Sequence, residues 1–348
     1  MGILQVLKTQ LLCHLIICYV FLVSGFIINL LQLCTLPLWY INKQLARRIN
    51  CRLGYSVSSQ LVALLEWWSG TECTLYTDPE SYPFYGKENA IVVLNHNFEI
   101  DFMTGWTFCE RFGVLGSSKV LAKKELSFVP VIGWMWYFLE IVFCKRKWEE
   151  DRKTVVQSLH NLRDYPEYFW FLLHCEGTRF TEKKHKISME VAEKKGQPKL
   201  KYHLLPRTKG FCVTVQNLRG TGESFLAFKG TVHLQLLVPI DLHIILLCQL
   251  TQDEFQEHYR QTGRFPGPIT SPPRRPWALL NWLFWVCLLV YPLCMLLLQM
   301  LLSESTFTVV CTFVFCLAVS VGIRWMIGQT EIDKGSNYGN KEMQINNN

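Results

Sequence analysis

Long stretches without a charged side chain constrain this 348-residue chain more than any other feature. No Asp, Glu, Lys or Arg occurs from residue 9 to 42, from 277 to 302, or from 306 to 323. An apolar stretch of about 20 residues is long enough to cross a bilayer as a helix. The first stretch is longer than the apolar core of a secretory signal, and it lacks a small-residue cleavage site. The chain is therefore predicted to be a membrane protein.

Residues 1–68 are predicted to form an N-terminal membrane anchor followed by an amphipathic helix. Polar and helix-breaking residues, Asn29 and Pro37 among them, interrupt the first apolar run. A helix that bends or re-enters the same leaflet is therefore an alternative to a simple span. In the basic stretch from 43 to 68, Arg47 and the neighbouring cations are expected to lie on lipid headgroups, with leucines facing inward.

The C-terminal part is predicted to be a transmembrane hairpin over residues 277–328, with a short turn at 303–305. A linker over 266–276, which contains five prolines, precedes it, and a polar tail over 329–348 follows it. Two buried core helices are the alternative. The outer ends of the hairpin are flanked by cations, which places them and the preceding domain in the cytosol. These cations are Arg274, Arg275, Arg324 and Lys334.

Residues 69–265 are predicted to form an α/β domain, because short strand-like runs at 90–94 and 168–173 alternate with helical patterns and polar turns. The apolar run 128–143 is expected to be core or an acyl tunnel, with a further span as the alternative. The net charge of +7 favours anionic partners, and the membrane segments argue against nucleic acid. The fourteen cysteines have no CxxC spacing, which predicts reduced thiols and no metal site.

The sequence Asn-His-Asn-Phe-Glu-Ile-Asp over residues 95–101 follows the first strand-like run directly. His96 and Asp101 are five residues apart, which separates their side chains by about 140° on one ideal helix. They can meet only if His96 lies in the turn and Asp101 in the first helical turn. Asp101 would then hold one ring nitrogen and leave the other to accept a substrate proton. The alternative is an ordinary hydrogen-bonded polar histidine.

Two further blocks follow strand-like runs. In Glu176-Gly177-Thr178-Arg179, the glycine allows close approach of backbone to a ligand, and the guanidinium suits a phosphate. A plain turn with a surface salt bridge is the alternative. The run 142–146 ends in cations, and Lys123 lies upstream. A solvated basic edge is the alternative there.

Together these blocks resemble the ordered motifs of the 1-acylglycerol-3-phosphate acyltransferases. Residues 95–101 match the first motif. The strand ending in Arg146 is similar to the second, with Glu140 in place of its leading glycine. Residues 175–179 resemble the third, with Cys175 where many members have proline, and residues 204–211 resemble the fourth.

The resemblance implies a mixed sheet with flanking helices and an endoplasmic reticulum membrane protein with a cytosolic catalytic domain. It implies acyl transfer from acyl-CoA to lysophosphatidic acid without a metal or other cofactor, with membrane phospholipid as a partner. His96 and Asp101 would form the general-base pair. The substrate-binding residues would be Lys123, Arg146, Glu176, Gly177, Thr178 and Arg179.

Residues 221–250 depart from the family pattern, because they are shorter and more apolar than expected. This leaves open a non-catalytic member of the family. Within enzymes, another lysophospholipid or glycerol 3-phosphate as acceptor is the alternative. A transporter or receptor fits poorly, because the apolar runs carry no acidic or basic residue at their centres.

Overall fold

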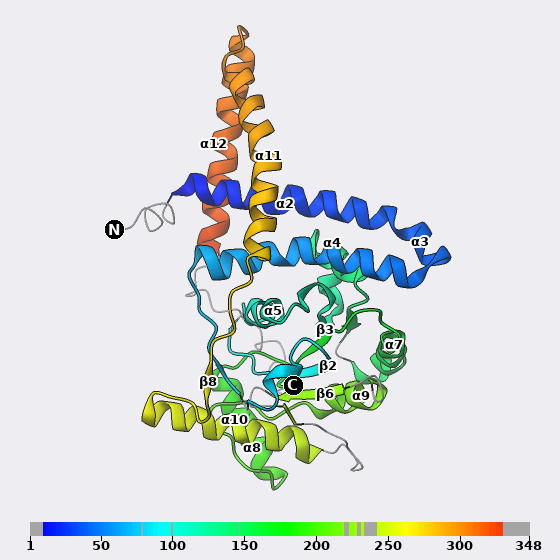
Figure 1. Ribbon diagram of the computed structural model, residues 1–348. Coiled ribbons are helices and arrows are strands. Elements are labelled where there is room, and N and C mark those ends of the chain that lie inside the picture. Colours follow the sequence, from blue (N-terminus) through cyan, green and yellow to red (C-terminus); the bar gives the residue numbers. More distant parts are fainter. Residues whose placement is uncertain are drawn as a thin grey trace, which may run out of the picture. The chain divides into compact units, whose positions relative to one another are not determined.

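A computed structural model describes residues 10–329 except 78, 99, 146, 219–222, 228–230 and 233–241 (Figure 1). Two compact units can be distinguished. Residues 21–284 form the larger unit, which contains the sheet, and the smaller unit combines the described residues up to Val20 with those from Trp285 onward. The larger unit therefore includes most of the N-terminal helical region, the predicted catalytic domain and the proline-rich linker.

A six-stranded sheet in the order β4-β3-β5-β2-β6-β7 forms the centre of the larger unit. Neighbouring strands are parallel except β6 and β7, which are antiparallel. The prediction of a mixed sheet with flanking helices is therefore confirmed. The sheet also continues through part of the divergent segment 221–250, where β6 pairs with β2. The strands are β2 (Asn89–Leu94), β3 (Lys119–Lys123), β4 (Val142–Cys144), β5 (Trp170–His174), β6 (Glu223–Ala227) and β7 (Thr231–Val232).

Strands β2 and β5 are apolar and buried on both faces, as expected for the centre of a parallel sheet. On one face, side chains such as Ile91 and Phe171 pack with α7 (Trp148–Asn161) and α9 (Thr208–Leu218). The other face is covered by α5 (Asp101–Arg111), where a Cβ on Gly105 would lie only 3.1 Å from Leu172. Gly105 therefore lets α5 pack directly against β5 and β2, where its Cβ would also lie 3.3 Å from Leu94.

The N-terminal helices α2 (Leu11–Cys34), α3 (Leu36–Ile41) and α4 (Lys43–Ala63) bend back on themselves, and a π-helical turn over Leu64–Trp68 follows. Gln60 Nε2 donates to Ser24 Oγ at 2.8 Å, and Asn50 Nδ2 donates to Thr35 Oγ1 at 2.8 Å. These two contacts require α4 to run antiparallel to the second half of α2. The bend that the interrupted apolar run suggested is therefore present.

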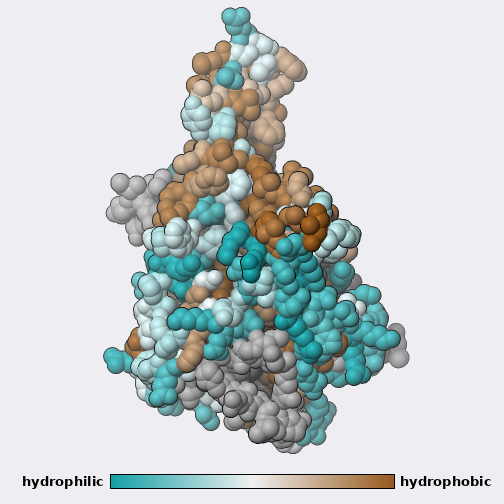
Figure 2. All heavy atoms as spheres, turned by 45° about the vertical axis from the view of Figure 1, so that its right-hand side comes forward, coloured by the Kyte–Doolittle hydropathy of each residue, from teal (hydrophilic) through white to brown (hydrophobic). Residues whose placement is uncertain are grey.

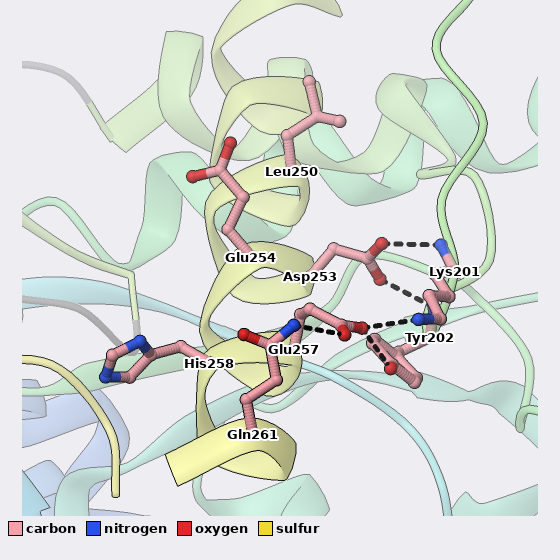
Figure 3. Close-up of a pocket in the computed structure, with 8 residues that line it drawn as sticks. All are labelled: Lys201, Tyr202, Leu250, Asp253, Glu254, Glu257, His258 and Gln261. Carbon is pink, nitrogen blue, oxygen red and sulfur yellow. Dashed lines mark hydrogen bonds and ion pairs between the residues drawn. The ribbon is translucent and has the colours of Figure 1, made fainter.

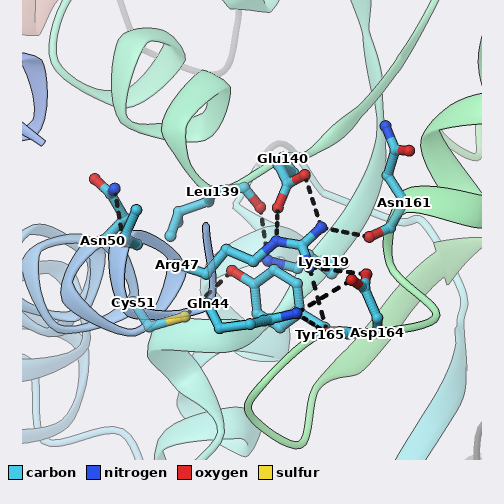
Figure 4. A network of polar contacts seen from close by, with 11 residues as sticks. Gln44, Arg47, Asn50, Cys51, Lys119, Leu139, Glu140, Asn161, Asp164 and Tyr165 are labelled. Atoms are coloured by element: carbon cyan, nitrogen blue, oxygen red, sulfur yellow. Dashed lines mark hydrogen bonds and ion pairs between the residues drawn. The ribbon is translucent and has the colours of Figure 1, made fainter. Parts of the chain in front are cut away.

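The expectation that Arg47 lies on lipid headgroups is wrong. Its side chain is fully buried and forms a bidentate ion pair with Glu140, at 2.6 and 3.0 Å, and a second ion pair with Asp164 at 2.8 Å (Figure 4). Arg47 Nη2 also donates to the Asn161 carbonyl, and Nη1 to the Asp164 carbonyl. The amphipathic pattern of α4 could not reveal that Arg47 is buried, because all three partners come from distant segments. The cluster fastens α4 to the sheet domain.

Lys119 completes the same cluster from the start of β3. Its side chain is buried, donates to the Leu139 carbonyl at 2.6 Å and lies 3.8 Å from the centre of the Tyr165 ring. Burial lowers the pKa of Lys119 to about 8. Glu140 adopts a left-handed backbone conformation (φ 54°), which is costly for a residue with a side chain. The bidentate contact to Arg47 holds Glu140 there.

The run 128–143 does not cross a membrane. It begins in the 3₁₀ turn η4 (Lys124–Phe128) and includes α6 (Ile132–Phe138), whose seven residues are too short for a span. Met135 and Trp136 are buried, in agreement with a core position, whereas Phe128 and Tyr137 are exposed.

The chain after the sheet continues with α10 (Leu242–Thr262), and a small antiparallel sheet joins β1 (Leu75–Tyr76) to β8 (Ile269–Thr270). The linker contacts α5, because Arg111 Nη1 donates to the Pro272 carbonyl at 2.6 Å. The remaining short elements of the described chain are η2 (Tyr82–Phe84), η3 (Leu115–Ser117) and α8 (Glu182–Lys194).

Two described segments are long and apolar enough to cross a membrane, Leu11–Ile41 and Trp277–Leu301, the second being α11. Helix α12 (Thr306–Gln329) contributes a shorter apolar stretch, Thr306–Gly322. Many large apolar side chains of α11 and α12 are exposed. On the face that Figure 2 shows, both extensive apolar surface and extensive hydrophilic surface are visible. The composition and exposure of these helices indicate a membrane-associated protein.

Candidate active site

The predicted blocks leave the sheet from the same edge. Leu94 at the end of β2 is paired with His174 at the end of β5, and Lys123 at the end of β3 is paired with Cys144 at the end of β4. Strand β3 lies next to β5. The carboxyl ends of four neighbouring parallel strands therefore meet, which is where open α/β sheets bind ligands.

His96 and Asp101 contact each other as the spacing required. His96 lies in the turn after β2, and Asp101 is the first residue of α5. His96 Nδ1 is 3.1 Å from Asp101 Oδ2. The His96 side chain is 27% exposed and that of Asp101 is 18% exposed, so the pair is open to a substrate rather than sealed in the core.

The surrounding hydrogen bonds define the tautomer of His96. Asp101 Oδ2 also accepts hydrogen bonds from the backbone N–H groups of Asn97 and Phe98, at 2.6 and 2.9 Å. This carboxylate oxygen is therefore an acceptor, and the proton between it and the imidazole belongs to Nδ1 of His96. In the neutral ring, Nε2 then carries a lone pair that can take a proton.

His174, the last residue of β5, lies at the site but was not predicted from the sequence. Its ring lies 4.7 Å from the His96 ring, centre to centre, with 38° between the planes. Its Nδ1 is 2.9 Å from the Asn95 carbonyl oxygen. Burial and the neighbouring His96 lower the pKa of His174. Only the parallel register of β2 and β5 brings the two histidines together, so no local pattern identified the pair.

Glu176 is buried, and neither of its carboxyl oxygens forms a hydrogen bond with a described residue. Burial raises the pKa of Glu176 to about 8, and the nearby amide groups of His96 and Leu204 offset only part of this effect. Glu176 is consequently protonated and neutral near pH 7, which removes a negative charge from the loop after β5.

Gly177, Thr178 and Arg179 form a tight loop directly after Glu176. Gly177 has a φ of 66°, a conformation that favours glycine, and its N–H donates to the His174 carbonyl at 3.0 Å. Lys184 Nζ donates to Thr178 Oγ1 at 2.9 Å and to the Arg179 carbonyl at 3.1 Å. The loop is thus held by a cation from α8.

Arg207, which belongs to the fourth motif, also lies at this loop and was not predicted as a site residue. Its N–H donates to the Cys175 carbonyl at 2.7 Å, and its side chain crosses Gly177 so closely that a Cβ on the glycine would lie 2.6 Å from Arg207 Cδ. Because Gly177 has no side chain, the aliphatic part of Arg207 can pack directly against the loop. The contact of Arg207 with Cys175 and Gly177 therefore places the fourth motif beside the candidate site.

The cations of the second motif are only partly described. Lys123 lies at the end of β3, on the edge shared with His174. Arg146 lies outside the residues that the structure describes. The described residues on either side of it, Lys145 and Lys147, donate their backbone N–H groups to Asp151 at 2.8 and 2.9 Å.

A pocket of about 470 Å³ lies elsewhere, on α10 (Figure 3). Asp253 there accepts hydrogen bonds from the N–H groups of Lys201 and Tyr202, and Glu257 pairs with Lys201 Nζ. These contacts join α10 to the chain segment leading to Arg207. Within the described residues, no three His, Cys, Asp or Glu side chains gather as metal ligands would.

A family model described as Acyltransferase matches residues 75–230, the part that holds His96, Asp101 and the loop after β5. The fold and the match define an acyltransferase domain.

Curated relatives of the chain refine this class. The chain is 58% identical to bovine 1-acyl-sn-glycerol-3-phosphate acyltransferase delta and 57% identical to the human delta protein, with 98% of each chain covered. It is 55% identical to the human gamma protein, with 99% covered. The chain belongs to the 1-acyl-sn-glycerol-3-phosphate acyltransferase family and is an O-acyltransferase. The alignment to the bovine protein spans 371 positions and therefore contains gaps in this chain. No solved structure matches the chain.

Proposed function

We propose that the protein transfers a fatty acyl group from acyl-CoA to the 2-hydroxyl of lysophosphatidic acid, giving phosphatidic acid and free CoA. The observation that carries the proposal is the contact between His96 Nδ1 and Asp101, which leaves Nε2 of a partly exposed imidazole as a base. The names of the close relatives support the choice of acceptor.

The reaction needs one base and no enzyme nucleophile. His96 Nε2 takes the proton of the acceptor hydroxyl while its oxygen forms a bond to the thioester carbonyl carbon. When the tetrahedral intermediate collapses, the carbon–sulfur bond breaks and the thiolate receives the proton from the imidazolium. Asp101 stabilises the imidazolium between these steps. No acyl-enzyme forms.

Cations at the same edge of the sheet are proposed to hold the phosphate of the acceptor. Arg179 has the planar fork that suits a phosphate, with Lys123 and Arg146 assisting. Because Glu176 is neutral near pH 7, it does not cancel the charge of these cations. Gly177 and Thr178 shape the loop, with the Thr178 hydroxyl bound to Lys184.

The membrane segments suit substrates and a product that carry acyl chains. We propose the endoplasmic reticulum membrane as its location, as the family resemblance implies. We further propose a cytosolic catalytic domain, because cations flank the outer ends of the C-terminal apolar run. At the cytosolic leaflet of that membrane, the catalytic domain would contact lysophosphatidic acid and membrane phospholipid directly.

The test of the acceptor is a competition assay with purified full-length protein and labelled acyl-CoA. Lysophosphatidic acid, other lysophospholipids and glycerol 3-phosphate are offered together. We expect labelled phosphatidic acid as the main product. Preferential labelling of another lipid would contradict the proposed acceptor, and a folded protein that labels none would contradict catalysis altogether.

The role of Arg179 is tested by R179A, with R163A as the control. Arg163 is an exposed arginine whose Nε donates to the Asn217 carbonyl at 2.6 Å. R179A is expected to raise the KM for lysophosphatidic acid about tenfold or more, as the loss of a charge-assisted hydrogen bond would. A change confined to the KM for acyl-CoA would contradict this role.

A further inference from the structure

We propose that His174 is a positioning residue for acyl transfer, which packs against the ring of His96 and keeps Nε2 of His96 directed at the acceptor hydroxyl. The inference rests on the proposed function, because it requires His96 as the base. Its basis is the ring contact, with 4.7 Å between ring centres and 38° between planes.

The His174 ring is itself held in place. Its Nδ1 lies 2.9 Å from the Asn95 carbonyl oxygen. A carbonyl oxygen can only accept, so Nδ1 of His174 carries the hydrogen. Asn95 directly precedes His96, and the paired ends of β2 and β5 fix the spacing between the two segments. The ring of His174 is therefore fastened to the backbone from which the base projects.

Two restraints of different kind then act on His96. The hydrogen bond to Asp101 fixes the direction of Nδ1, whereas contact on the ring face limits rotation about that direction. A base must lie within hydrogen-bond reach of the proton that it takes, and a displacement of about 1 Å can cost 10²-fold in rate. Both restraints are needed to fix the position of Nε2.

The chemistry also favours an uncharged neighbour. His96 becomes positively charged during each turnover, and a second cation against its face would oppose that step. Burial lowers the pKa of His174, so its ring stays neutral near pH 7. A neutral aromatic ring supports His96 without repelling the imidazolium.

Three substitutions of His174 separate its ring from its hydrogen bond. H174A removes both, H174N keeps a donor for the Asn95 carbonyl, and H174F keeps a neutral ring. We expect kcat to fall about 10- to 100-fold in H174A and H174N, with the KM for each substrate within about twofold of the original. H174F is expected to stay within about fivefold of the original kcat.

His185 offers a matched control. Its Nε2 lies 2.8 Å from the Leu200 carbonyl oxygen, and its ring is 5.3 Å from the Phe180 ring at 40°. It has the same two kinds of contact but does not touch the His96 ring. H185A is expected to keep kcat within about twofold per folded molecule, with folding followed by thermal unfolding.

Several results would overturn the inference. These are a normal kcat in H174A or H174N, a loss confined to the KM of one substrate, or a loss in H174F as large as that in H174A. Failure of the unsubstituted protein and of H185A to acylate lysophosphatidic acid would instead refute the proposed function, and the two failures are thus distinguishable.

Discussion

Two histidine–aspartate pairs in this molecule have the same hydrogen-bond pattern and different surroundings. Asp101 accepts from His96 Nδ1 and from two consecutive backbone N–H groups. Asp253 does the same with His203 Nδ1, at 2.9 Å, and with the N–H groups of Lys201 and Tyr202. The His96 side chain is 27% exposed, whereas that of His203 is 6% exposed.

The comparison teaches that the carboxylate–imidazole contact alone does not define a catalytic base. The Asp253 pair joins α10 to the segment before Arg207, and its histidine is sealed away. The Asp101 pair lies at the carboxyl edge of the parallel strands, beside cations and a neutral buried carboxyl group. Exposure of the imidazole side chain and position in the fold therefore distinguish the proposed base from the buried pair.

Replacing the two aspartates should separate these roles most strongly. In D101N the amide can donate to His96 Nδ1 and so favour the wrong tautomer, and we expect the rate of acyl transfer to fall about 10²- to 10⁴-fold. D253N should lower stability but leave the rate per folded molecule within about threefold. Initial rates normalised to folded protein provide the measurement. Equal losses in both variants would remove the distinction.

The Arg47 cluster extends the comparison to polar groups that only support the fold. R47A leaves Glu140, whose side chain is only 17% exposed, without its partner, and we expect the free energy of unfolding to fall by about 3 kcal/mol. R52A, on the same helix, removes an exposed pair with Glu167 and should cost at most about 1 kcal/mol. Denaturant unfolding in detergent measures both. A cost for R47A no larger than that for R52A would contradict the role assigned to the cluster.

Glu176 gives a pH-dependent prediction. Its pKa is raised in the folded protein to about 8, so the unfolded state releases the proton first as pH rises. Stability relative to E176Q should therefore fall from about pH 4.5 to pH 8, by roughly 2–4 kcal/mol in all. Thermal unfolding of both proteins across this range measures the difference. A constant difference would show that Glu176 is not protonated by burial.

Arg207 should give the smallest effect. Because its stem lies over Gly177, we expect R207A to raise the KM for one phosphate-bearing substrate about tenfold, with kcat nearly unchanged. Separate titrations of lysophosphatidic acid and acyl-CoA identify which one. R260A is a control, since Arg260 on α10 pairs with Tyr202. Unchanged KM values for both substrates would exclude Arg207 from the substrate site.

The sequence predicted the parts of the site that lie close together along the chain. His96 and Asp101 flank one strand-to-helix turn, so the local pattern was sufficient to predict their contact. The loop from Glu176 to Arg179 follows one strand, as expected, and its role in binding stays a prediction. His174 could not be predicted, because its contact with His96 depends on which strands are neighbours.

The buried position of Arg47 escaped prediction for a related reason. An arginine on an amphipathic helix is expected at a headgroup, and only the distant residues Glu140 and Asp164 make its burial favourable. Arg207 likewise reaches the loop by a contact with Gly177, which a motif alone does not reveal.

The central claim is that His96, and not merely any histidine bound to an aspartate, is the base. Phosphatidic acid formation per folded molecule in H96A and H203A tests it most directly. We predict a loss of about 10²- to 10⁴-fold in H96A, with H203A within a few fold of the original rate. Near-normal turnover in H96A would contradict the account.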